Sequence, residues 1–472
     1  MQKIKVLWFR QDFRLENNPA YYEISNSKEK FIAIYAFDQK KFNERSAQRW
    51  WLYKTLQNIE KKLSDKGVIF KIFACDITEA IQHVIKDKSI ETIYWNELNE
   101  PSEIKKDLIL ENYLNQNSIK YKKFKGNLLQ DPFVVKKKDG TPFQVFTPYW
   151  KNAEEQYLRN NNYVNKVSNF KNTPLKNNNN EILDKFIKPR KNWYVKFEKY
   201  WKVGEENAKI LLKDFISKKI SNYATNRDIP SSDGTSKLSP YLAFGEISVQ
   251  TLFDECYKIS KKNIGFRKFI NEIGWREFSH HLINHFPKME SGNLRKQFDK
   301  FKWVKDSDKL TKWKKGQTGY PIVDAGMREL RETGWMHNRV RMITASFLVK
   351  HLRINWIEGE KYFRDSLLDF NTANNVAGWQ WVAGCGADAA PYFRIFNPIL
   401  QGEKFDPEGI YVKKWIKELS MLPKKFIHKP WELPSDLCNQ YDFDLARDYT
   451  KPIVKHEEAR KLALNAFSEL KN

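Results

Sequence analysis

A run of thirteen residues in the last third of the chain combines one carboxylate, four amides and two indoles. It extends from Asp369 to Trp381 and reads DFNTANNVAGWQW. Buried amides must be hydrogen-bonded, and a planar heterocycle with alternating donors and acceptors would satisfy such a cluster. A polar loop anchored by aromatic packing is the alternative, and it accounts less well for so many amides in one place.

A second segment, 232–240, places hydroxyl groups and Lys237 before a proline. Pro240 suits the first turn of a helix, and Ser239 suits its N-cap. Backbone N–H groups at such a helix start can bind a pyrophosphate. Taken alone, the segment is explained as well by an ordinary capped helix.

A third segment, 271–279, brings a carboxylate, an indole and a guanidinium to one helix face. Glu272, Trp275 and Arg276 are spaced i, i+3 and i+4. An indole flanked by hydrogen-bonding groups can stack on a nucleobase while a carboxylate contacts the base edge. A half-buried tryptophan beside a solvated ion pair is the alternative for this segment alone.

The fourth segment, 334–342, reads GWMHNRVRM. On a helix, Asn338, Arg341 and Met342 share a face, and Arg339 lies off it. Two arginines could bind two polyanions, such as a cofactor diphosphate and a DNA backbone. His337 is more typical of an interior histidine than of a ligand.

Two kinds of sequence pattern indicate the elements that position these segments. Near-continuous apolar runs joined by helical patterns favour a parallel sheet covered on both faces. The expected strands are 5–9, 31–37, 68–75, 91–95 and 119–124, and the expected helices are 47–64, 78–86 and 102–115. No GxGxxG follows the first strand, so a glycine-rich dinucleotide-binding loop is not expected there.

The remainder of the chain changes character twice. Residues 126–203 are polar and irregular and indicate a long interdomain linker. From 204 onward, 3.6-residue periodicity dominates and predicts a helical domain. The predicted organisation is an α/β domain at 1–125, a linker at 126–203 and an all-α domain at 204–472.

The composition favours a polyanionic partner. Lys and Arg total 82 against 58 Asp and Glu, so the 472-residue chain carries a formal charge of +24. Such an excess points to nucleic acid first, and a lysine-rich coding bias is the alternative explanation of charge alone. With 41% hydrophobic and 30% charged residues, collagen-like, membrane-spanning and wholly disordered classes are excluded. Sixteen tryptophans suggest packing, stacking or electronic roles for many of them.

The cysteines and the N-terminus indicate the compartment. Cys75, Cys256, Cys385 and Cys438 are far apart and form no CxxC pair. Neither a disulfide framework nor a metal site is therefore expected. The N-terminal apolar run is short and fits a strand better than a signal peptide, and no run approaches the roughly 18 apolar residues of a membrane helix. We therefore predict a reduced, cytoplasmic protein.

Jointly, the four segments resemble the photolyase/cryptochrome family, and most of all its class I bacterial cyclobutane pyrimidine dimer photolyases. The hallmark strings are TSKLS at 235–239, WMHNR at 335–339 and WQW at 379–381. The resemblance covers nearly the whole chain, from about residue 7 to 406. It implies a Rossmann-like parallel-sheet domain, a long linker and a C-terminal helical domain that binds FAD.

The resemblance also implies roles for individual positions around the flavin. Asn375 lies where photolyases carry Asn and plant cryptochromes typically carry Asp, near flavin N5. Trp303, Trp356 and Trp379 match the tryptophan chain that carries an electron inward to photoreduce FAD. The expected cofactor-binding residues are Tyr223, Thr235, Ser236, Lys237, Leu238, Ser239, Arg341, Asp369, Phe370, Asn371 and Asn375.

Substrate-facing positions are implied in the same way. Glu272 would hydrogen-bond a pyrimidine carbonyl, and Trp275 and Trp381 would form apolar walls around a flipped dimer. Similar enzymes for six-four photoproducts carry His where Asn338 stands, so Asn338 favours cyclobutane dimers. The full expected set is Arg227, Glu272, Trp275, Arg276, Asn338, Arg339, Met342, Trp381, Arg394 and Gln401.

The predicted function is light-driven repair of cyclobutane pyrimidine dimers by electron transfer from reduced, photoexcited FAD. A blue-light photoreceptor without repair activity and a basic nucleic-acid-binding protein are the alternatives. The expected partner is UV-damaged DNA, with no protein partner and a monomeric state. A second, antenna chromophore is expected, but 46–51 and 95–98 match neither the folate nor the deazaflavin pattern. Asn371 stands where relatives usually carry a second Asp; its carbonyl could still accept from the flavin N3–H, but it adds no charge toward redox tuning of the flavin.

Overall fold

The computed structural model describes seven stretches of the chain: 3–27, 29–37, 46–87, 89–160, 168–189, 192–259 and 263–470. Across these stretches, no helix combines the length and the apolar character needed to cross a membrane. The backbone divides into two compact units, each built from separate segments. Unit 1 takes 1–221, 236–287 and 368–373, and unit 2 takes 222–235, 288–367 and 374–472.

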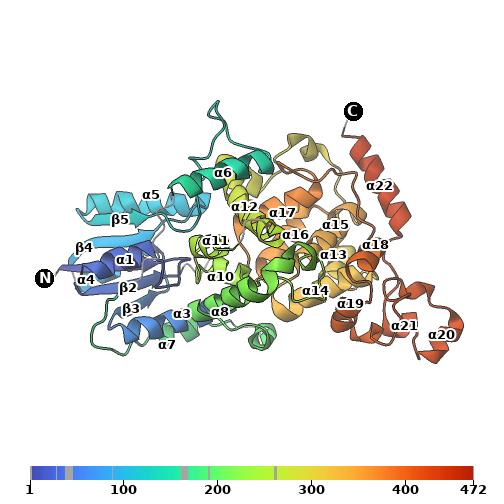
Figure 1. Ribbon diagram of the computed structural model, residues 1–472, viewed down its shortest axis with the longest axis horizontal. Helices are drawn as coiled ribbons and strands as arrows, with labels where there is room; N and C mark the ends of the chain where they lie inside the picture. The colour runs from blue at the N-terminus through green and yellow to red at the C-terminus, as the bar shows by residue number, and fades with distance from the viewer. Residues whose placement is uncertain are drawn as a thin grey trace. The chain divides into compact units, whose positions relative to one another are not determined.

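Unit 1 is organised around a five-stranded parallel sheet (Figure 1). The strand order is β3-β2-β1-β4-β5, which confirms the predicted Rossmann-like parallel sheet. Six of the seven residues of the central strand β1 are buried, because both faces of the sheet are covered. The strands are β1 (Lys3–Phe9), β2 (Phe31–Ala36), β3 (Ile69–Phe73), β4 (Ser89–Asn96) and β5 (Lys120–Phe124).

The helices of the sheet domain pack through the expected apolar residues. Ile81 and Leu110 join the core cluster that contains Val6 and Ile34 of the sheet. The three predicted helices are confirmed, and a fourth, α1, begins at the Asn18-Pro19 signal that the sequence analysis did not use. The helices are α1 (Pro19–Asn26), α3 (Ser46–Asp65), α4 (Ile77–Asp87) and α5 (Pro101–Gln116).

A buried ion-pair cluster fixes α5 against the end of β1. Arg10 donates to Asp107 at 2.7 Å and to Glu103 at 2.8 Å, and its guanidinium lies over the Trp8 ring at 4.4 Å. The residues after β1 therefore serve packing, in keeping with the absence of a glycine-rich loop there.

Part of the segment predicted to be irregular is helical. Helix α6 (Phe146–Asn160) packs on α12 (Ile264–His285) at Gly274, where a Cβ would overlap the Trp150 indole. The buried residues of α6 do recur at helical spacing, but the prediction followed the polar composition of the whole 126–203 segment. The expectation of an irregular chain is thus wrong for this stretch, and the boundaries at 125 and 203 stay predictions. Unit 1 also contains α7 (Asn180–Ile182), η1 (Leu183–Ile187), η2 (Asn192–Lys199), α8 (Glu205–Asp214), η3 (Phe215–Lys219), η4 (Ile220–Asn222), α10 (Ser239–Ala243) and α11 (Val249–Tyr257).

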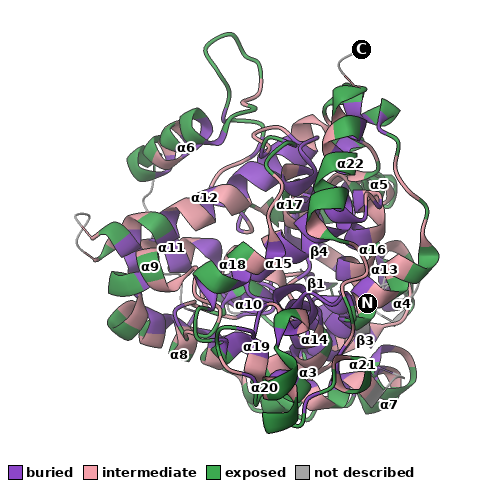
Figure 2. Ribbon diagram, turned by 90° about the vertical axis from the view of Figure 1, so that its right-hand side faces the viewer, coloured by how far each residue is buried: buried purple, intermediate pink, exposed green. Residues whose placement is uncertain are grey.

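The described residues of unit 2 form helices joined by loops and contain no strand, as predicted. Helices α14 and α15 are mostly buried, whereas α20 is exposed over most of its length (Figure 2). Gly326 of α14 permits the close approach of α15, because a Cβ there would overlap Val340. The main helices are α9 (Tyr223–Asn226), α13 (Ser307–Lys315), α14 (Pro321–Thr333), α15 (Asn338–Ser346), α16 (Trp356–Ser366), α17 (Thr372–Ala383), α18 (Pro398–Phe405), α19 (Ile410–Trp415), α20 (Ser435–Gln440), α21 (Leu445–Asp448) and α22 (His456–Ser468). The shorter ones are η5 (Pro287–Glu290), η6 (Lys296–Lys300), η7 (Phe347–His351), η8 (Lys417–Leu419) and η9 (Pro430–Glu432). The first residues of η5 and α17 and the last residue of η4 belong to the other unit.

Candidate active site

The predicted phosphate-binding loop has an unusual backbone. Lys237 has φ +52°, in the left-handed region, and Leu238 follows it in the right-handed helical region. Successive residues of opposite hand point their N–H groups into one concavity, which is a general anion-binding arrangement. The Ser236 hydroxyl also accepts from the Leu238 N–H at 3.4 Å. This loop fits a diphosphate.

The helix after this loop begins one residue earlier than expected. Leu238 occupies the N-cap position and Ser239 is the first residue of α10, so the prediction of Ser239 as N-cap is wrong. The turn at Lys237 already brings Leu238 into helical conformation, which leaves Ser239 inside the helix. Pro240 lies in the first turn, as predicted.

Two residues far away in sequence hold the segment 368–373. The Gln48 amide donates to the carbonyls of Leu368 and Phe370, at 3.3 and 2.7 Å. Glu100 accepts from the Asn371 amide at 3.0 Å and from the Thr372 hydroxyl at 3.2 Å. Because a carboxylate only accepts, the NH₂ of Asn371 faces Glu100 and its carbonyl oxygen faces the other way. Sequence analysis missed both anchors.

A similar constraint orients Asn375 in unit 2. Its NH₂ donates to the backbone carbonyl of Glu360 at 3.2 Å and to the Glu360 carboxylate at 3.1 Å. Glu360 is itself buried and pairs with Arg364 at 2.9 Å. The Asn375 carbonyl oxygen therefore points away from α16. Both predicted flavin amides, Asn371 in unit 1 and Asn375 in unit 2, are thus oriented through their NH₂ groups.

The remaining predicted cofactor residues of unit 2 lie in two places. Arg341, on α15, donates from Nε to the Met336 carbonyl at 2.7 Å. Tyr223 is buried at the start of α9, and the Arg227 guanidinium lies 5.4 Å from its ring centre. Thr235 belongs to unit 2, whereas the residues that follow it in the loop belong to unit 1.

The three predicted electron-transfer tryptophans differ in burial. Trp303 is half-buried, whereas Trp356 and Trp379 are 1% and 2% exposed. Trp356 donates from its indole N–H to Asn293 at 2.9 Å. The indole N–H of Trp379 is buried with no hydrogen-bond partner among the described residues, and such an orphaned donor suits a site completed by a bound group.

One backbone hydrogen bond and one side-chain contact bring the three tryptophan segments together. The N–H of Val304, next to Trp303, donates to the Arg353 carbonyl at 2.8 Å, three residues before Trp356. Helix α16 starts at Trp356, and on its first turn Gly359 leaves room for the Trp379 indole, which a Cβ would overlap. The order from the half-buried to the buried end is therefore Trp303, Trp356, Trp379.

Helix α12 positions the substrate-facing residues predicted in unit 1. Trp275 stacks on Phe146 of α6, with ring centres 3.9 Å apart and planes 7° apart. Trp275 and Glu272 both remain half-buried. Arg276 donates to Glu277 at 2.9 Å and to the Asn127 carbonyl at 3.0 Å. Arg276 is thus engaged within unit 1 and serves at least in part to hold the chain around 127.

Helix α15 carries three of the predicted substrate-facing residues of unit 2. Asn338 is exposed at its first position. Arg339 donates to Asp228 at 2.8 Å, and its Nη1 lies 3.8 Å from the Met342 sulfur. The expectation that Arg339 lies away from Met342 is therefore wrong, because residues three apart are neighbours on a helix. His337 caps the helix and is buried, which confirms its interior role.

The other predicted substrate residues lie on α17, on α18 and in the chain between these helices. Trp381 is half-buried at the end of the WQW string, Arg394 is exposed, and Gln401 is half-buried on α18. Between the two indoles, Gln380 is fully buried and donates to the carbonyls of Met289 and Gly292 at 2.7 and 3.0 Å. These two hydrogen bonds from the Gln380 amide thus hold the conformation of the segment 379–381.

The predicted antenna residues serve mostly in the core of unit 1. Trp50, Trp51 and Trp95 are at most 3% exposed. Trp51 donates to Glu246 at 3.2 Å, and Asn96 donates to Asp12 at 2.6 Å. These contacts leave the identity of an antenna open.

Comparison with known proteins identifies the class to which this fold and these residues belong. A family model for the FAD binding domain of DNA photolyase matches residues 269–469, and one for DNA photolyase matches 5–169. The chain is 38% identical to the deoxyribodipyrimidine photo-lyase of Agrobacterium fabrum, over 99% of this chain and 98% of the relative. It is also 34% identical to Cryptochrome-2 of Arabidopsis thaliana, over 99% of this chain and 79% of that one.

A solved structure gives the same result. The fold matches a bacterial class III photolyase from Agrobacterium tumefaciens with a TM-score of 0.91 and 38% identity, covering 100% of this chain and 98% of that one. The chain therefore belongs to the DNA photolyase family and carries its FAD-binding domain. Within unit 1 the loop at Lys237 suits the diphosphate of FAD, and within unit 2 the buried Trp379 N–H suits a bound group.

Proposed function

We propose that this chain repairs cyclobutane pyrimidine dimers in DNA with light. The observation that carries the proposal is the match of residues 269–469 to the FAD binding domain of DNA photolyase, a stretch in which Asn371 and Asn375 are oriented by Glu100 and Glu360. When bound, reduced FAD supplies the photoexcited electron that splits the dimer. The relatives named deoxyribodipyrimidine photo-lyase support this activity.

The cofactor is held by groups of different kinds. The loop 236–239 binds the diphosphate through its backbone N–H groups, together with Thr235 and Tyr223. Arg341, Asp369, Phe370 and the two asparagines contact the isoalloxazine ring. Trp303, Trp356 and Trp379 would relay electrons one at a time from a reductant in solution, and two such transfers with a proton would convert oxidised FAD to its fully reduced state.

The DNA is bound in two ways. Lys and Arg side chains on a chain of net charge +24 contact phosphates, and this binding weakens as salt rises. The lesion is turned out of the DNA helix at a cost of about a few kcal/mol. This cost is smaller for a damaged pair than for an intact one, because the damaged pair stacks poorly. Phe146 stacks on one face of the Trp275 indole, and the dimer stacks on the opposite face. Glu272 hydrogen-bonds a pyrimidine edge. Asn338, Arg339, Met342, Trp381, Arg394, Arg227 and Gln401 supply the remaining contacts.

A blue-light photoreceptor without repair activity is the second candidate. The similarity to Cryptochrome-2 favours it. Asn375 favours the repair function, because photolyases carry Asn at the matching position and plant cryptochromes typically carry Asp. The likeness to a class III photolyase favours class III membership, and the class I assignment stays a prediction. An antenna chromophore, folate or deazaflavin, also stays a prediction, as do the monomeric state and the cytoplasmic location.

Glu272→Ala tests the substrate role. Reduced holoenzyme is mixed with irradiated oligothymidine, exposed to blue light and assayed for remaining dimers. The variant should repair at least about tenfold less per photon absorbed, since one hydrogen bond to a charged intermediate contributes about 1.5–3 kcal/mol, while its FAD content stays that of the wild type. Equal repair by the variant would remove Glu272 from the mechanism, and absence of repair by the wild type would favour the photoreceptor.

A further inference from the structure

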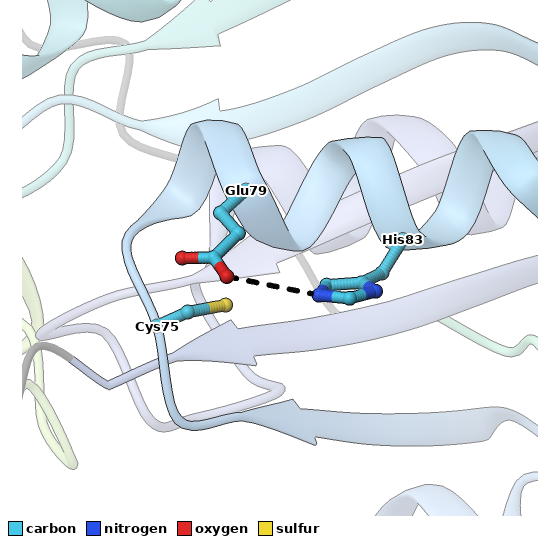
Figure 3. A group of neighbouring side chains, drawn as sticks. All are labelled: Cys75, Glu79 and His83. Atoms are coloured by element: carbon cyan, nitrogen blue, oxygen red, sulfur yellow. Dashed lines mark ion pairs between the residues drawn. The ribbon is translucent and has the colours of Figure 1, made fainter.

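Three potential metal ligands meet in unit 1, in residues to which the proposed repair reaction gives no part. Cys75 follows β3, and Glu79 and His83 lie one turn apart on α4 (Figure 3). The sulfur, one carboxylate oxygen and one ring nitrogen all lie within 4.8 Å of one another. The Glu79 oxygen and the His83 Nε2 are 3.9 Å apart.

Local structure holds these side chains in place. Asp76 accepts from the N–H groups of Thr78 and Glu79, at 2.8 and 3.1 Å, and so fixes the start of α4 directly after Cys75. Glu79 and His83 share a helix face because they are four residues apart. The His83 ring stacks on Phe73, the last residue of β3, with ring centres 6.1 Å apart and planes 10° apart.

We propose that Cys75, Glu79 and His83 bind a Zn²⁺ ion. Zinc accepts sulfur, nitrogen and oxygen together, whereas magnesium and calcium prefer oxygen alone. Tetrahedral bonds of about 2.0–2.3 Å put ligand atoms roughly 3.3–3.6 Å apart, so the three groups need only close by about 1 Å. The thiol proton passes to solvent as the zinc–sulfur bond forms.

The exposure of the cluster leaves room for a fourth ligand. The side chains of His83 and Glu79 are 50% and 54% exposed, so water completes the coordination. Three protein ligands and one water make an open site. The ion would tie the end of β3 to α4, a link that the exposed Glu79–His83 ion pair alone makes only weakly.

A reactive thiol is the competing reading of Cys75. Redox and nucleophilic cysteines have lowered pKa values, near cationic groups. Burial, with the negative charges of Glu79 and Asp76, instead raises the pKa of Cys75 to about 11. The surroundings of this sulfur thus attract a cation and do not activate a free thiolate.

The test titrates the full-length protein with Zn²⁺ alone by calorimetry. We expect one ion per chain, with affinity reduced about 10-fold or more by Cys75→Ser and by His83→Gln. Cys438→Ser is the matched control, because Cys438 is the other half-buried cysteine, and its affinity should stay that of the wild type. Zinc binding that survives both Cys75→Ser and His83→Gln, or no stoichiometric binding at all, would overturn the proposal.

Alkylation gives a second readout that needs no variant. The protein is treated with iodoacetamide with and without Zn²⁺, and modified cysteines are located by peptide mass spectrometry. Zinc should protect Cys75 and leave Cys438 unprotected. Equal labelling of Cys75 in both samples would contradict the site whatever the repair activity of the protein.

Discussion

Replacing Phe146 by leucine tests whether stacking on this ring holds the Trp275 indole in the orientation that binds a base. The two rings are stacked at 3.9 Å with nearly parallel planes, and leucine keeps most of the volume but offers no ring face. A stacked aromatic pair contributes about 0.5–1.5 kcal/mol beyond its buried area. If that energy holds the indole in its binding orientation, affinity for a dimer-containing strand falls roughly 2- to 13-fold.

The assay is fluorescence anisotropy of labelled oligothymidine, irradiated or not, titrated with holoenzyme in the dark. Undamaged strand should bind the variant as it binds the wild type, because phosphate contacts do not involve Trp275. Phe133→Ala is a matched control, since this phenylalanine lies in the same 126–203 segment, is 45% exposed and contacts His285. Unchanged affinity for damaged strand in Phe146→Leu, or an equal loss for both strands, would refute the reasoning.

Three further predictions test other parts of the account. Trp303→Phe should slow photoreduction of oxidised FAD at least about tenfold, as followed by absorbance, while pre-reduced enzyme repairs normally; unchanged photoreduction would remove Trp303 from the chain. Glu100→Ala frees the Asn371 amide and should weaken FAD binding about 5- to 30-fold, from the roughly 1–2 kcal/mol of such hydrogen bonds; unaltered binding by flavin fluorescence would contradict its positioning role. Burial raises the pKa of Glu246 from 4.5 to about 7, so the folded state holds a proton that the unfolded chain releases. The free energy of unfolding should therefore fall by about 3 kcal/mol as pH rises from about 4.5 to 7, and Glu246→Gln should remove that part of the slope in denaturant titrations; identical pH profiles of variant and wild type would contradict it.

The sheet could be predicted because its physical signal is local. Strands covered on both faces are continuous apolar runs, and turn residues bound them. Helix α6 was missed although Tyr149, Trp150 and Ala153 recur at helical spacing, because polar residues and turn signals dominate the segment around it. The start of α10 was misplaced by one residue because the left-handed turn at Lys237 is not visible in residue types.

The residues of the candidate site could be predicted from short sequence motifs, but the residues that orient them could not. Asn371 and Asn375 were found through their clustering, whereas their anchors Glu100 and Glu360 carry no signal of their own. Glu100 is 271 residues away from Asn371 along the chain, and no spacing rule reaches so far. The proposed zinc ligands were missed for a different reason. Cys75, Glu79 and His83 recur at intervals of four, which a search for paired cysteines does not detect.

The most direct measurement is the number of thymine dimers left in irradiated oligothymidine after incubation with the reduced, FAD-loaded protein, in blue light and in darkness. The account predicts that dimers disappear catalytically in the light and persist in the dark. Persistence of dimers in both samples, with FAD bound and fully reduced, would contradict it.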